Sequence, residues 1–150
     1  MPADPAASLQ GILFFSLLSA VSVWDIRCRR IPDFLQAGIA ALALLDFSPD
    51  HLVGILCMLP YLAVALFSRK KEGIGGGDVK LAGSTGLVLG LPAALTASVA
   101  GLSCFILFGA GLFLWKRAGE KGTRSPFPVG PFLAAGCMCA YVMKMKGLIV

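Results

Sequence analysis

A long uncharged stretch constrains the fold of this chain more than any other feature. From Leu81 to Trp115 no residue carries a charge. A helix crosses the hydrocarbon core of a bilayer with about 20 residues, so this stretch is too long for one crossing and too apolar for a soluble loop. Gly90 and Pro92 interrupt it, and such residues break helices. We therefore predict two membrane helices here, at 79–90 and 93–115.

The composition of the whole chain agrees with a membrane protein. Of its 150 residues, 57% are hydrophobic and 14% are charged, against about 25% charged in a soluble domain. The mean hydropathy is +0.84. A small soluble domain cannot bury that much apolar surface, which excludes an ordinary cytosolic globule and a disordered chain. The length allows about six spans and no soluble catalytic domain, so residues 1–150 are predicted to form a single transmembrane domain.

Four further apolar segments complete the predicted helices. The first of them, Leu9–Trp24, is preceded by no Lys or Arg and shows no small-residue cleavage pattern. We therefore interpret it as a retained helix rather than a signal peptide. Ser48–His51 is predicted to be a turn. The four segments are Leu9–Trp24, Phe34–Phe47, Leu52–Phe67 and Phe132–Met143. The fold expected from these patterns is all-α, a polytopic membrane helical bundle of about six transmembrane helices.

The basic residues indicate how this bundle sits in the membrane. Eleven of the 13 Lys and Arg residues fall at the connections after the first, third and fifth predicted spans. They are Arg27, Arg29, Arg30, Arg69, Lys70, Lys71, Lys80, Lys116, Arg117, Lys121 and Arg124. The positive-inside rule makes that side cytoplasmic, with both termini outside; Lys144 and Lys146 are the exceptions. The net charge of +5 therefore reports sidedness rather than nucleic-acid binding.

Two of the eight acidic residues stand directly at the ends of predicted spans. Asp25 follows the apolar run that ends at Trp24, and Asp78 precedes the run that starts at Val79. Both lie near the cytoplasmic boundary, where ionisable groups are costly and often functional. Asp25 could simply end a span, and Asp78 could simply cap a helix. The glycines 75–77 before Asp78, however, permit close approach of another backbone or a substrate, which is more than a cap requires.

Two carboxylates at one depth would share a proton if they met, because like charges a few ångströms apart do not both ionise readily. One could then act as general base on water while the other, protonated, polarises a peptide carbonyl. This is aspartic-protease chemistry and needs no cofactor. No metal site is expected, since the only histidine is His51, interpreted as a solvated loop residue, and the five cysteines form no CxxC pair. A non-enzymatic membrane assembly factor or a small transporter is the alternative.

Three segments resemble the motifs of the type IV prepilin leader peptidases, which are GxGD membrane aspartyl peptidases. Trp24–Asp33 resembles their first aspartate motif, in which Asp is followed by basic residues and Ile-Pro-Asn. The segment Gly75–Ala82 resembles their GxGD motif, and Phe127–Ala135 is similar to their late Pro-Gly-Pro-Phe-Leu-Ala segment. The three occur in the family's order and together cover nearly the whole chain.

The resemblance implies an endopeptidase that removes the basic leader of type IV prepilins or pseudopilin-like precursors. It would act at the cytoplasmic face of a bacterial cell membrane, with the lipid bilayer as surroundings. By carry-over, Asp25 and Asp78 are the catalytic pair. Gly75 and Gly77 would shape the loop beside Asp78, and Lys80 would contact substrate or phospholipid, or only reach the interface. The CxxC-bearing cytoplasmic domain of larger members has no counterpart among these motifs, so N-methylation is not expected.

Overall fold

The computed structural model describes residues 5–46, 48–67, 75–117 and 128–149. Within these ranges every regular element is a helix, which confirms the all-α prediction. In chain order the elements are α1 (Pro5–Cys28), α2 (Asp33–Leu42), α3 (Pro49–Val53), the short 3-10 helix η1 (Gly54–Cys57), α4 (Met58–Phe67), α5 (Gly76–Leu89), α6 (Leu91–Arg117) and α7 (Gly130–Met145).

Each predicted span coincides with helical structure. Gly90 separates α5 from α6 as expected, with a φ of +80° that a glycine adopts without strain. The predicted segment Leu52–Phe67 is helical in three consecutive pieces, α3, η1 and α4. The segment predicted from Phe34 to Phe47 is shorter, because α2 ends at Leu42.

The predicted turn at Ser48–His51 is wrong. Pro49 begins α3, in keeping with the preference of proline for the first helical position. His51 therefore lies in a helix and is not a solvated loop residue. Its Nδ1 is 3.1 Å from the carbonyl oxygen of Asp46, and its Nε2 is 2.8 Å from Nζ of Lys144 on α7. Because a carbonyl only accepts, these contacts require that Nδ1 carries the proton and Nε2 accepts from the lysine.

Two of the helices are long and apolar enough to cross a membrane by length and composition. They cover Ala7–Cys28 and Leu91–Leu112. The other apolar helices are shorter; α2, with 10 residues, rises only about 15 Å, half of a hydrocarbon core of about 30 Å.

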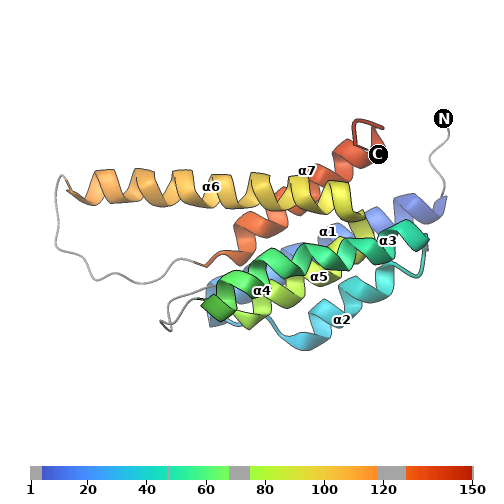
Figure 1. The fold of residues 1–150 in the computed structure, drawn as a ribbon, viewed down its shortest axis with the longest axis horizontal. Coiled ribbons are helices and arrows are strands. Elements are labelled where there is room, and N and C mark those ends of the chain that lie inside the picture. The colour runs from blue at the N-terminus through green and yellow to red at the C-terminus, as the bar shows by residue number, and fades with distance from the viewer. Residues whose placement is uncertain (1–4, 47, 68–74, 118–127, 150) are drawn as a thin grey trace.

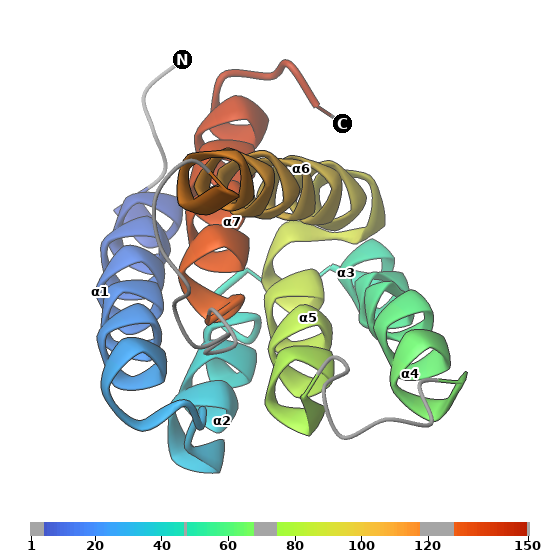
Figure 2. The same cartoon turned by 90° about the vertical axis from the view of Figure 1, so that its left-hand side faces the viewer.

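The helix ends alternate between two ends of the molecule (Figure 1). The C-terminal ends of α1, α4 and α6 and the N-terminal ends of α2, α5 and α7 point to one end, and the start of α1 and the end of α7 lie towards the other. Viewed from that first end, α1 lies beside α7 and α2, α5 follows, and α4 is outermost (Figure 2). Helices that are distant in sequence, such as α1 and α7, therefore pack together.

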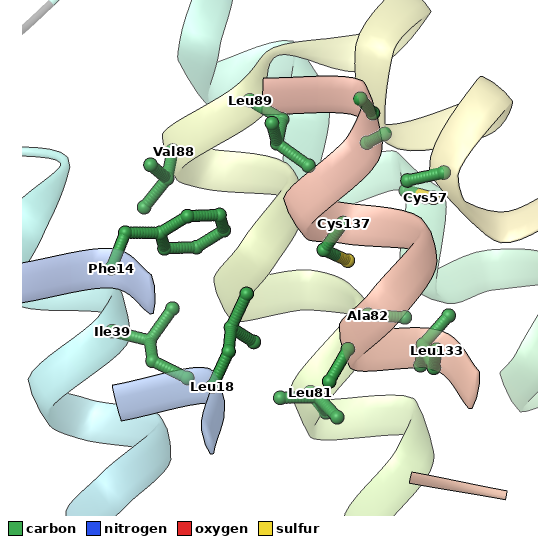
Figure 3. Close-up of a cluster of buried hydrophobic side chains, with 14 of the residues drawn as sticks. Phe14, Leu18, Ile39, Cys57, Leu81, Ala82, Val88, Leu89, Leu133 and Cys137 are labelled. Atoms are coloured by element: carbon green, nitrogen blue, oxygen red, sulfur yellow. The ribbon is translucent and has the colours of Figure 1, made fainter. Parts of the chain in front are cut away.

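The apolar core lies where α1, α2, α5 and α7 face one another (Figure 3). Its largest members are fully or almost fully buried: Phe14, Leu18, Ile39, Leu81, Leu89, Leu133, Val21, Val88, Cys57 and Cys137. Burying such side chains fixes the relative positions of the four helices. Because α1, α2, α5 and α7 also carry or border the acidic residues singled out above, the core holds those residues in place.

Glycines bring helix backbones into direct contact at two crossings. A Cβ on Gly54 of η1 would collide with the carbonyl of Gly86 on α5, and the reverse collision holds as well. A Cβ on Gly136 of α7 would likewise collide with the backbone of Ala97 and Gly101 on α6. Small residues at such crossings are typical of helices that pack without a hydrophobic driving force between them, as in membranes.

Candidate active site

A cleft of about 310 Å³ opens at the end of the bundle where α1 ends and α2 and α5 begin. Both aspartates singled out from the sequence line it, as do the three glycines before Asp78. The remaining lining residues come from the connection between α1 and α2 and from the starts of α2 and α5: Arg29, Arg30, Ile31, Asp33 and Lys80. Residues about 50 positions apart in sequence thus meet at one cleft.

Asp25 is held in the last turns of α1 and is nearly buried, with 7% of its surface exposed. The backbone N–H of Gly130, at the start of α7, donates a hydrogen bond of 3.0 Å to its Oδ2. A hydrogen bond from a backbone amide to a carboxylate oxygen stabilises the ionised form and fixes the orientation of the group. Gly130 also has no room for a side chain, since a Cβ there would lie 3.0 Å from Cγ of Asp25.

Asp78 is the third residue of α5, and the N-cap is Gly75. Asp78 is thus not the N-cap residue itself, but its carboxylate accepts a hydrogen bond from the backbone of the N-cap residue, Gly75. Burial raises the pKa of Asp78 from 3.8 to about 6, the negative charge of Asp25 adds to the rise, and a backbone hydrogen bond from Gly75 opposes it. The two carboxylates are thus close enough for the charge of one to disfavour ionisation of the other.

The glycines before Asp78 show no unusual backbone geometry, and only Gly77 comes close to a residue of another segment. Among the described glycines, positive φ values occur only at Gly90 and Gly147. Gly75 leaves ordinary contact space, since a Cβ there would lie 3.7 Å from Oδ2 of Asp78. Gly77 is tighter, because a Cβ would lie 3.4 Å from Cβ of Ile31. At Gly76 a Cβ would meet nothing within 4 Å, so of the three glycines only Gly77 lies close to the chain between α1 and α2.

Lys80 lies at the rim of the cleft and does not pair with Asp78. Its Nζ forms an ion pair of 2.7 Å with Asp33 at the start of α2. The two side chains are 59% and 78% exposed, and exposed pairs of this kind contribute at most about 1 kcal/mol. Lys80 thus bridges α5 and α2 at the surface, and its ammonium group borders the cleft.

Two residues at the site were not found by sequence reasoning. Gly130 belongs to the Phe127–Ala135 motif, which carried no site residue in the sequence prediction; its backbone N–H nevertheless binds the carboxylate of Asp25. Gln36 is a polar residue in the apolar segment Phe34–Phe47, and its Nε2 donates a hydrogen bond of 3.0 Å to the carbonyl of Gly77. In the described part of the chain, no three His, Cys, Asp or Glu residues gather as metal ligands would.

Comparison with known proteins identifies the family of the chain. Residues 12–116, which include both cleft aspartates, match the model of the type IV leader peptidase family. The chain belongs to this family. It is also 34% identical over 139 residues to the prepilin leader peptidase/N-methyltransferase of Bacillus subtilis (strain 168), a match that covers 88% of this chain and 54% of the relative. The chain thus spans about half the length of that curated relative, and no solved structure matches it.

Proposed function

We propose that this protein is a membrane-embedded aspartic endopeptidase that removes the basic leader of type IV prepilins or pilin-like precursors. One observation carries the proposal: Asp25 and Asp78, from two different helices, line one cleft at the end of the bundle. Membership in the type IV leader peptidase family supports a peptidase, and the printed name of the Bacillus subtilis relative supports a prepilin as substrate.

The chemistry follows from a proton shared by two carboxylates. The ionised carboxylate takes a proton from water as the water oxygen bonds to the scissile carbonyl carbon, and the protonated carboxyl gives its proton to the carbonyl oxygen. The tetrahedral intermediate collapses when the C–N bond breaks and a proton passes to the leaving amine. The pair's macroscopic pKa values govern both steps, so neither aspartate is assigned as the base.

The same proposal places the cleft at the cytoplasmic face of a bacterial cell membrane. The cleft is lined by Arg29, Arg30 and Lys80, which belong to the eleven basic residues on the predicted cytoplasmic side. The alternation of helix ends in Figure 1 is compatible with about six spans. In this topology, α2 and α5 are short helices whose polar starts, at Asp33 and Gly76, lie at the cytoplasmic boundary.

Conservative substitution of the aspartates tests the proposal. Asp25→Asn and Asp78→Asn keep the size of each side chain but remove the shared proton, so each is expected to abolish cleavage of a co-expressed type IV prepilin. The mass of the prepilin, measured by mass spectrometry, reports whether the leader has been removed. The control is Asp46→Asn, at an exposed position beyond the C-terminal end of α2. This variant should remove the leader as the unmodified protein does. Normal processing by Asp78→Asn would favour the assembly-factor or transporter alternative.

A further inference from the structure

Gln36 is a buried polar residue on an otherwise apolar helix face. It lies on α2 next to Leu35 and one turn before Ile39, and only 5% of its surface is exposed. Burying an amide away from water costs free energy unless the amide forms hydrogen bonds. Its Nε2 donates to the carbonyl oxygen of Gly77 at 3.0 Å, while Oε1 has no hydrogen-bond partner among the described residues. If this position only packed α2 against its neighbours, an apolar side chain would stabilise it more than a glutamine does.

The carbonyl that Gln36 contacts belongs to the first turn of α5. Gly77 directly precedes Asp78, and a carbonyl oxygen has two lone pairs, so it can accept from Gln36 as well as from the helix. On the other side, Ile31 lies beside this turn, since a Cβ built on Gly77 would be 3.4 Å from Cβ of Ile31. The turn that carries Asp78 is therefore held between the chain preceding α2 and a side chain of α2 itself.

The other polar link between α2 and α5 is the ion pair of Lys80 with Asp33, and it is exposed. Exposed ion pairs hold two helices weakly, because water and salt screen them. The Gln36 bond is sheltered and directional, so it restricts how the start of α5 can shift or rotate relative to α2. Since Asp25 is separately fixed by Gly130, the position of Asp78 sets the geometry of the pair.

We infer that Gln36 is a positioning residue of the peptidase, one that fixes Asp78 relative to Asp25 by holding the carbonyl of Gly77. The inference rests on the proposed function, since a position matters for rate only if the two aspartates catalyse. Gln36 is not among the residues that line the cleft. It acts through the backbone that presents Asp78, and small displacements of a catalytic group have large effects on rate.

The chain offers a matched control in Gln10. This second buried glutamine, 2% exposed, also donates through Nε2 to a backbone carbonyl on α2, that of Leu42, at 2.9 Å. It lies on α1 at the end of the bundle away from the cleft, where its Oε1 accepts from Tyr141. Gln36→Met and Gln10→Met thus remove the same kind of bond between helices, one beside Asp78 and one far from it.

The test compares kcat, KM and the pH profile of cleavage of one purified type IV prepilin by the full-length variants in detergent. Gln36→Met is expected to lower kcat roughly 10- to 100-fold, with KM nearly unchanged and with a shifted pH profile. Gln10→Met should lower the melting temperature while kcat per folded protein stays the same. Equal kcat values and pH profiles for Gln36→Met and the unmodified protein would overturn the inference.

A second substitution, Gln36→Glu, tests the inference if the Gln36→Met protein does not accumulate in the membrane. Gln36→Glu preserves size, and its carboxyl can donate to the Gly77 carbonyl only while protonated, so kcat should fall as that carboxyl ionises with rising pH. An unmodified profile for Gln36→Glu would overturn the inference. Failure of the proposed function and failure of the role of Gln36 give different results. An active Asp78→Asn variant would contradict the proposed function. An inactive Asp78→Asn variant together with fully active Gln36 variants would contradict only the role of Gln36.

Discussion

Gly130 lies against the carboxylate of Asp25, and a Cβ there would be 3.0 Å from Cγ of that residue. We expect Gly130→Ala to push that carboxylate away and to lengthen its hydrogen bond, so prepilin cleavage should fall roughly 10- to 100-fold. Gly38→Ala is the control, because a Cβ there would meet Leu17 at an ordinary 3.5 Å. Kinetic measurement of both variants checks the prediction, and a Gly130→Ala rate equal to that of Gly38→Ala would contradict it.

The raised pKa of Asp78, about 6 against 3.8, also has a consequence for stability. Because the pKa of Asp78 is higher in the folded than in the unfolded protein, this group contributes to the free energy of unfolding only while it is protonated. Its contribution is complete below about pH 4 and is lost as the pH rises through about 6. Asp78→Asn does not titrate, so its melting temperature should exceed that of the unmodified protein at pH 7 but not at pH 4. Thermal unfolding in detergent across this range, with Asp46→Asn as the control for one lost charge, checks this; a gain of equal size at pH 4 would contradict it.

Single residues were predictable from the sequence only where their position along the chain was itself unusual. Asp25 and Asp78 stand out because each is a charge at the end of an apolar run. Gly130 and Gln36 do not, because their hydrogen bonds join residues 105 and 41 positions apart. Such contacts are created by helix packing, which leaves no local pattern in the sequence.

At the scale of helices, glycine contacts make a separate prediction. Gly86 of α5 touches the backbone of Gly54 in η1, and a Cβ would collide with it. Gly86→Ala should therefore separate the two elements and lower stability by roughly 1–3 kcal/mol, as overpacking does. Gly109→Ala on α6, with nothing within 4 Å, should be neutral or stabilise by up to about 1 kcal/mol. Thermal unfolding of both variants is the measurement, and equal melting temperatures would contradict the close contact.

The helices themselves were largely predictable, since apolar runs bounded by charges, glycine or proline gave each one. The errors had different causes. α2 ends at Leu42, although the apolar run continues, and the carbonyl of Leu42 accepts from Gln10 on α1, which is not near in sequence. The error at Ser48–His51 is local, because Pro49 takes the first position of α3 and proline is common at helix starts as well as in turns.

At the scale of the whole molecule, charge and fold point to the same sidedness. Arg29, Arg30 and Lys80 line the cleft at one end, while the start of α1 and the end of α7 lie towards the other. A bilayer with its cytoplasmic side at the cleft would satisfy the positive-inside rule and expose the aspartate pair to precursors made in the cytoplasm. The position of the cleft in the membrane is therefore the property that most directly tests the proposed reaction.

Thiol labelling in sealed cells can determine that position. Cys28 is exposed and follows Asp25 by three residues, so a variant that keeps only this cysteine reports on the cleft end. Asp46→Cys in a background without the native cysteines reports on the opposite end. We expect a membrane-impermeant maleimide to label Asp46→Cys in intact cells. Cys28 should react only after the membrane is opened, because the bilayer separates a cytoplasmic Cys28 from a reagent added outside. Labelling of Cys28 from outside would place the aspartates on the wrong face for cytoplasmic cleavage.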